Sequence, residues 1–126
     1  MNKINILHVL TSPKAEGTPR LVLDWLDEKY VDQSVLFLRE TPGDLYDHFI
    51  RKNVPLYSGE LHYAGIFSRI INITRTTHKY CKMIHPDLVI CWNQGNAQWI
   101  LLGAKIAGVS HLILHAGAGP AYHNLY

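Results

Sequence analysis

Three short segments of the sequence hold the residue types that bind anions and sugar hydroxyls. In the first, residues 11–20, Gly17 lies just before a predicted helix that begins at Thr18 and Pro19 and continues with Arg20. A helix N-terminus offers free N–H groups and partial positive charge, which suit an anion. Glycine allows close approach to the backbone, and arginine can bind a phosphate through two hydrogen bonds. An ordinary turn followed by a solvated arginine fits these residues equally well.

The second and third segments are residues 93–98 and 115–119. Asn93 and Asn96 can bind sugar hydroxyls or cap the helix that follows them. The His115 imidazole can orient a hydroxyl or stabilise developing charge. On residue type alone, a strand-end histidine more commonly bonds only to the backbone. Gly117 allows close approach to the backbone, but a plain turn explains it as well.

Five apolar runs alternate with helical patterns and would bring these segments together. We expect strands at residues 4–10, 34–38, 54–57, 88–92 and 111–115, and helices beginning near Thr18 and Thr41 and covering residues 67–84 and 94–107. This alternation predicts an α/β fold, a Rossmann-like doubly wound parallel sheet of order 3-2-1-4-5 in three α/β/α layers. Ligands in such folds bind beyond the carboxyl ends of the strands, at the switch point between strands one and four.

Helical spacing predicts which faces are buried. The first helix should bury Leu21, Val22, Trp25 and Leu26, and the second has Leu45, Phe49 and Ile50 at helical spacing. The long helix should bury Phe67, Ile70, Ile71, Thr74, Cys81 and Ile84. Trp92 and Trp99 can stack on a sugar, although packing is the commoner role of such residues. Cys81 and Cys91 are expected in the core.

Composition excludes several classes of protein. The 126 residues are 48% hydrophobic and 17% charged, which suits one globular domain. A net charge of +2 does not indicate a nucleic-acid partner. The N-terminus reads as a strand rather than a signal peptide, so we expect the chain in the cytoplasm with reduced cysteines. His and Cys spacings predict no metal site, and neither a Gly-x-Gly-x-x-Gly fingerprint nor a Walker loop occurs.

The order of motifs resembles the N-terminal, acceptor-side domain of family-4-type GT-B glycosyltransferases. The stretch KINILHVLTSPKAEGTPRLVLDWL is similar to the opening strand, loop and helix of that family. HPDLVICWNQGNA resembles the family's Pro-Asp-Val-Val-His-x-His-Asn segment, and AKIAGVSHLILHAGAG resembles its Ala-x-x-Ala-Gly-Val-Pro segment and the following strand that ends in His. The first loop departs from the pattern: Glu16 replaces a glycine, and Pro19 replaces the acid before Arg20. Both departures count against phosphate contact by this loop.

The resemblance implies the acceptor-binding part of an enzyme that transfers a sugar from a nucleotide-sugar donor to a glycan or glycolipid, with retention. His115 would be the catalytic residue near the transferred sugar. Gly17, Thr18, Arg20, Asn93, Asn96 and Gly117 would bind substrate. The resemblance implies no cofactor or metal, only the nucleotide-sugar as co-substrate. Residues 1–126 would form an incomplete N-terminal domain, inactive without a C-terminal donor domain supplied in cis or in trans.

Two other functions are compatible with the sequence. One is a non-catalytic scaffold or partner subunit, and the other is a stand-alone nucleotide- or phosphate-binding module. The predicted half-fold exposes apolar surface, which predicts self-association. Arg69, Arg75, Lys79 and Lys82 either form a solvated helix face or contact anionic lipid at the inner face of a membrane.

Overall fold

A computed structural model of the chain describes residues 3–10, 22–39, 46–61, 65–92 and 97–115. The described strands form one parallel five-stranded sheet in the order β3-β2-β1-β4-β5. The elements are β1 Asn5–Leu10, β2 Asp32–Phe37, α2 Tyr46–Arg51, β3 Leu56–Ser58, α3 Ile66–Ile84, β4 Leu88–Cys91, α4 Ala97–Ile106 and β5 His111–Leu114. The predicted fold class and strand order are therefore confirmed, and only strand ends shift by one or two residues.

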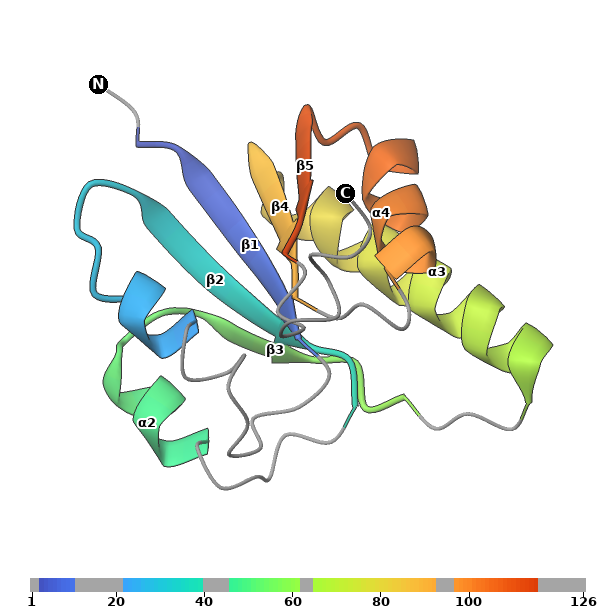
Figure 1. Cartoon of the computed structure of the whole chain (residues 1–126), viewed down its shortest axis with the longest axis horizontal. Coiled ribbons are helices and arrows are strands. Elements are labelled where there is room, and N and C mark those ends of the chain that lie inside the picture. Colours follow the sequence, from blue (N-terminus) through green and yellow to red (C-terminus); the bar gives the residue numbers. More distant parts are fainter. Residues whose placement is uncertain (1–2, 11–21, 40–45, 62–64, 93–96, 116–126) are drawn as a thin grey trace, which may run out of the picture.

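Helices lie on both faces of the sheet, as a doubly wound fold requires (Figure 1). On one face α3 and α4 lie side by side and cover alternate strand residues, including Leu7, Leu36 and Val89. On the other face a helical segment at residues 22–25 and α2 pack on the intervening strand residues. Each central strand is buried on both sides, which explains its continuous apolar sequence.

The switch point falls between β1 and β4. The central strand β1 pairs in parallel with β2 on one side and with β4 on the other. Two reciprocal hydrogen bonds join Asn5, at the start of β1, to Asp87, just before β4. The Asn5 N–H donates to Asp87 Oδ2 at 2.9 Å, and the Asp87 N–H donates to the Asn5 carbonyl at 2.8 Å. These bonds help to set the register of β1 with β4, and the parallel pairing of β4 with β5 aligns the carboxyl end of β5 with theirs, at the edge where the predicted segments begin.

The predicted buried face of α3 is confirmed in its second half and wrong in its first. Cys81 is buried and Ile84 packs against the core, but Phe67 is 78% exposed and Ile71 is 51% exposed. Ile73 and Thr77, which were not predicted, are buried instead. Apolar residues occur nearly all round the first half of this helix, so its periodicity does not select a face. Contact with α4 does: a Cβ on Gly103 would lie 2.5 Å from the Thr74 carbonyl oxygen, so the two helices approach backbone to backbone there.

The first two helices confirm the predictions in part. Val22, Leu26 and Phe49 are buried, but Trp25 is 44% exposed and Ile50 is also exposed. Leu21, Leu45 and the predicted helix starts at Thr18 and Thr41 lie outside the described residues. Both cysteines are buried, as predicted, and burial raises the pKa of Cys81 to about 11.

Candidate functional site

A chain of buried polar side chains runs through the sheet face that residues 22–25 cover. His8, at the middle of β1, is fully buried. Its Nε2 lies 2.7 Å from Gln33 Oε1 on β2, and its Nδ1 lies 3.0 Å from the indole nitrogen of Trp92, just after β4. Gln33 Nε2 donates in turn to the Trp25 carbonyl at 2.8 Å. Neighbouring strands and the covering helix are thus joined by directional bonds within an otherwise apolar layer.

These partners fix the protonation state of His8. An indole N–H can only donate, so His8 Nδ1 must accept. The single ring proton therefore lies on Nε2 and is donated to the Gln33 carbonyl oxygen. Burial lowers the pKa of His8 below its ordinary value of 6.5, and the Gln33 bond only partly opposes this. The hydrogen-bond partners and the burial both favour a neutral His8 imidazole, which holds the Trp92 indole in place.

Trp92 in turn supports His115, which follows β5. The two ring centroids are 4.3 Å apart at an interplanar angle of 35°, and the His115 N–H donates to the Cys91 carbonyl at 2.9 Å. The imidazole is therefore fixed by stacking and by its own backbone. Its Nδ1 is buried and has no hydrogen-bond partner among the described residues. An unprotonated imidazole nitrogen at the carboxyl edge of the sheet can accept a hydrogen bond from a ligand hydroxyl that reaches it.

The structure places only part of the predicted site. His115 lies beside the end of β4, at the carboxyl edge of the sheet. The switch point between β1 and β4, where the topology predicts ligands, is on the other side of β4. Gly17, Thr18, Arg20, Asn93, Asn96 and Gly117 lie outside the described residues, so their roles stay predictions. Asn93 directly follows Trp92 in the chain, and Gly117 follows His115 by two residues.

Sequence reasoning missed His8 and Gln33. Each is a polar residue within an apolar strand, which is the one signal that the sequence carries for it. Their partners are distant in sequence: Trp92 is 84 residues from His8, and Gln33 is 25 residues away. Trp92 and Trp99 both pack against core residues, the commoner of the two roles considered for them.

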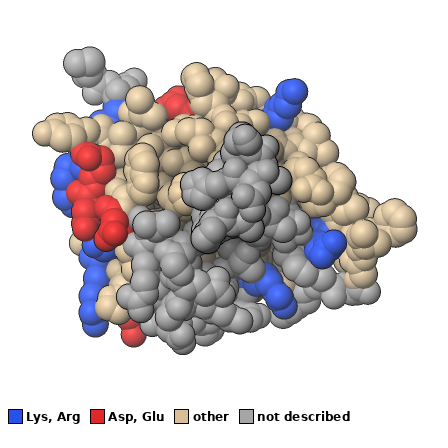
Figure 2. Space-filling model, viewed as in Figure 1, with Lys and Arg blue, Asp and Glu red and all other residues tan. Residues whose placement is uncertain are grey.

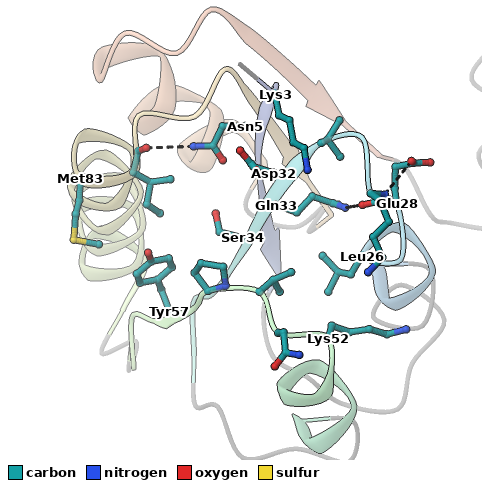
Figure 3. A pocket seen from close by; sticks show the side chains of 16 residues that line it. Lys3, Asn5, Leu26, Glu28, Asp32, Gln33, Ser34, Lys52, Tyr57 and Met83 are labelled. Atoms are coloured by element: carbon teal, nitrogen blue, oxygen red, sulfur yellow. Dashed lines mark hydrogen bonds between the residues drawn. The ribbon is translucent and has the colours of Figure 1, made fainter. Parts of the chain in front are cut away.

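A separate cavity opens at the opposite, amino-terminal end of the strands. It has a volume of about 650 Å³, and Asn5, Asp32 and Ser34 are among the residues that line it (Figure 3). The side-chain amide of Asn5 donates a hydrogen bond to the Ile84 carbonyl, and that of Gln33 donates one to the Glu28 carbonyl. These bonds connect the segments that line the cavity. Ser34 Oγ is buried there, and no described residue forms a hydrogen bond with it. The cavity lies away from His115, and no chemistry was predicted for it.

Two general features of the described residues bear on function. In this part of the chain, no three His, Cys, Asp or Glu side chains are grouped so that they could hold a metal ion. None of its helices has the length and apolar character needed to cross a membrane.

Comparison with known proteins gives a match in fold. No family model and no curated protein matches the sequence. A lipopolysaccharide outer core galactosyltransferase, WaaB in its apo form, matches with a TM-score of 0.71 and 13% identity, over 88% of this chain and 32% of that chain. A glycosyltransferase from Rickettsia africae matches with a TM-score of 0.67 and 13% identity, over 100% of this chain and 34% of that chain. A UDP-N-acetylglucosamine 2-epimerase matches with a TM-score of 0.66 and 16% identity, over 98% and 35%.

The chain thus spans about a third of the length of each of these three proteins. Identities this low show a shared fold, and one fold supports several chemistries. The chain has the Rossmann-like fold found in part of glycosyltransferases and of an epimerase. Membership of family 4 and placement at the N-terminal, acceptor side stay predictions.

Proposed function

We propose that this chain is the acceptor-binding part of a glycosyltransferase, which transfers a sugar from a nucleotide-sugar donor to a glycan or glycolipid. The observation that carries the proposal is the buried Nδ1 of His115, which has no hydrogen-bond partner within the described part of the chain and belongs to a ring stacked on Trp92 at the carboxyl edge of the sheet. The fold shared with two glycosyltransferases supports the reaction class. The motif resemblance supports the acceptor side, retention, and a donor domain in cis or in trans.

In this proposal His115 orients the acceptor. A sugar hydroxyl donates to Nδ1, which aligns the hydroxyl oxygen toward the donor. As that oxygen forms its bond to the anomeric carbon of the donor sugar, the bond from this carbon to the nucleotide phosphate breaks, the phosphate leaves with the bonding electrons, and the hydroxyl proton passes to Nδ1. Stacking on Trp92 and the backbone bond to Cys91 limit ring rotation, so little entropy is lost when the ligand binds. His8 acts one step further away, because it holds the Trp92 indole.

The remaining predicted residues complete the proposed site. Asn93, Asn96 and Gly117 would contact acceptor hydroxyls, because they adjoin Trp92 and His115 in the sequence. Gly17, Thr18 and Arg20 would approach the acceptor or the donor diphosphate from the loop after β1. The nucleotide-sugar would be a co-substrate, and no other cofactor is proposed.

A glycan array tests the proposal. The labelled full chain should bind at least one class of glycan, and His115→Ala should lose that binding while its thermal unfolding stays as in the wild type. His111→Ala is the matched control, because His111 is an exposed histidine at the other end of the same strand. Equal binding by wild type and His115→Ala would remove His115 from the site.

A parallel titration with UDP, GDP and FMN separates this proposal from a stand-alone nucleotide-binding module. Tight FMN binding, together with an empty glycan array, would contradict the glycosyltransferase function. In an assembled enzyme that contains a donor domain, His115→Ala should lower turnover without lowering stability.

A further inference from the structure

Three polar side chains lie together in the cavity at the amino-terminal end of the strands. Asn5 begins β1 and is in register with Asp32, which begins β2, and Ser34 follows two residues further along β2. Residues in register on neighbouring strands face the same side of a sheet, and so do alternate residues of one strand. Leu36 continues this alternate series and belongs to the core under α3 and α4. The three side chains therefore occupy the end of the face that α3 covers (Figure 3).

Each of these side chains has an oxygen atom that the described residues leave without a partner. Asn5 donates through Nδ2 to the Ile84 carbonyl at 3.4 Å, and no described hydrogen bond uses its Oδ1. The Asp32 carboxylate takes part in no hydrogen bond or ion pair within the described ranges. Ser34 is only 3% exposed, and its Oγ is buried without a hydrogen-bond partner in the described part of the chain. A buried hydroxyl in this state calls for a partner from a bound molecule.

The same cavity also has positive charge. Lys3 and Lys29 line it, and neither ammonium group forms an ion pair with a described residue. By contrast, the Glu28 carboxylate accepts two backbone N–H groups, and the Lys52 ammonium is paired with Asp27. On the face shown in Figure 2, acidic and basic side chains lie next to one another on the side where β2 begins. Available charges of both signs suit a ligand that carries both.

Apolar groups complete the wall beside the three oxygens. They are the Tyr57 ring from β3 and the side chains of Met83 and Ile84 from the C-terminal end of α3. Met83 is 54% exposed, so its apolar surface is available to a ligand. The cavity volume of about 650 Å³ is within the range of about 300–1,000 Å³ that is usual for small-molecule sites.

We propose that this cavity binds a free α-amino acid with an apolar side chain. The ammonium group of the amino acid has three N–H donors, which match the acceptor oxygens of Asn5, Asp32 and Ser34. Its carboxylate pairs with Lys3, and its side chain packs on the apolar wall. A neutral sugar would use the oxygens but would leave the charges of Asp32 and Lys3 unpaired. The cavity is at the opposite end of the strands from His115, so this inference does not depend on the proposed glycosyltransferase function.

Isothermal titration calorimetry of the full chain with L-leucine, L-methionine and L-phenylalanine tests the site. At least one of the three amino acids should bind. Two analogues of the amino acid that binds measure the contribution of each charge. The amine that lacks the carboxylate and the acid that lacks the ammonium group should each bind about tenfold more weakly or worse. For L-leucine these analogues are 3-methylbutylamine and 4-methylpentanoate.

Substitutions locate the ligand in the cavity. Asp32→Asn removes one charge at the exposed start of β2 and should weaken binding about tenfold. Asp24→Asn is the matched control, because Asp24 is an exposed acid that does not line the cavity, and this variant should bind as the wild type does. Ser34→Ala should weaken binding about fivefold. It should not lower the midpoint of thermal unfolding, because it removes a buried hydroxyl that no described residue satisfies.

Four outcomes would overturn the proposal. Absence of binding by all three amino acids would remove the ligand class, and equal binding by the acid that lacks the ammonium group would remove the role of the three oxygens. Equal losses in Asp32→Asn and Asp24→Asn would place the ligand elsewhere. Saturable binding of calcium chloride, or of N-acetylglucosamine, with no binding of an amino acid would indicate a cation site or a sugar site instead.

Discussion

Replacing Trp92 by Phe should destabilise the fold by more than the loss of indole surface explains. The indole N–H is the one donor to His8 Nδ1 among the described residues, and both side chains are buried. The variant leaves this nitrogen without a partner, which costs about 1–3 kcal/mol. The smaller ring also leaves unfilled space, for roughly 1 kcal/mol more. We therefore expect a loss of about 2–4 kcal/mol in the free energy of unfolding at neutral pH.

This loss should shrink as the pH falls. In the wild type, burial holds the pKa of His8 below 6.5, so the unfolded state binds more protons and stability falls as the pH drops below that value. A proton on His8 Nδ1 must also displace the Trp92 N–H. In Trp92→Phe the nitrogen is free to accept a proton, so the pKa of His8 should rise toward 6.5. The variant then loses less stability in acid than the wild type does.

Urea unfolding followed by far-ultraviolet circular dichroism measures both effects, at about pH 7.5 and about pH 5.5. Trp99→Phe is the matched control, because Trp99 is a half-buried residue of α4 and none of the hydrogen bonds described for this structure involves its indole. Trp92→Phe should be the more destabilising variant, and only its deficit should depend on pH. Equal deficits in the two variants, or a pH-independent deficit in Trp92→Phe, would refute the proposed hydrogen bond.

Three further predictions concern packing, thiols and the sheet edge. Gly103→Ala should lower stability by roughly 1–3 kcal/mol in urea unfolding, because its Cβ would meet backbone of α3 and force the helices apart; an unchanged midpoint would contradict this contact. Native Cys81 should react slowly with iodoacetamide at neutral pH, because burial raises its pKa to about 11, and rapid labelling would show an accessible thiol. Ile113 and Leu114 on β5 are 48% and 45% exposed, so the chain should self-associate in sedimentation and Ile113→Lys should reduce this. A wild-type monomer at high concentration would disprove it.

The sheet was predictable because each strand is a short apolar run bounded by turn residues or by Pro-Asp. Such runs have few alternatives, and the βα alternation then fixes a parallel order. Helix faces were less predictable. In α3 the residues Ile66, Phe67, Ile70, Ile71 and Ile73 provide apolar side chains in several directions. The buried direction is decided by the close approach of Gly103 on α4, which lies far away in the sequence.

The candidate site was only partly predictable for a related reason. His115 could be found because it ends an apolar strand at the carboxyl edge of the sheet. Its stacking on Trp92 depends on the pairing of β4 with β5, which places the residues after both strands next to each other. His8 and Gln33 acquire a role only through partners on other strands, and a single sequence offers no local pattern for such pairs.

The neutral His8 links the fold to the proposed chemistry. Its two bonds hold Trp92, and Trp92 supports the imidazole of His115. A buried polar network that is fully satisfied specifies one arrangement of side chains, which suits a site that must orient a ligand. Substitutions at His8 should therefore weaken ligand binding through Trp92 and His115, although His8 itself does not contact the ligand.

The most direct test of the account is an NMR titration of the full chain, labelled on tryptophan and histidine, with the glycan that the array selects. We predict that the Trp92 indole and the His115 ring signals shift together on binding, while those of Trp99 and His111 stay in place. Shifts confined to Trp99 or His111, or saturation of binding with no change at Trp92 and His115, would contradict the claim that these two residues form the acceptor site.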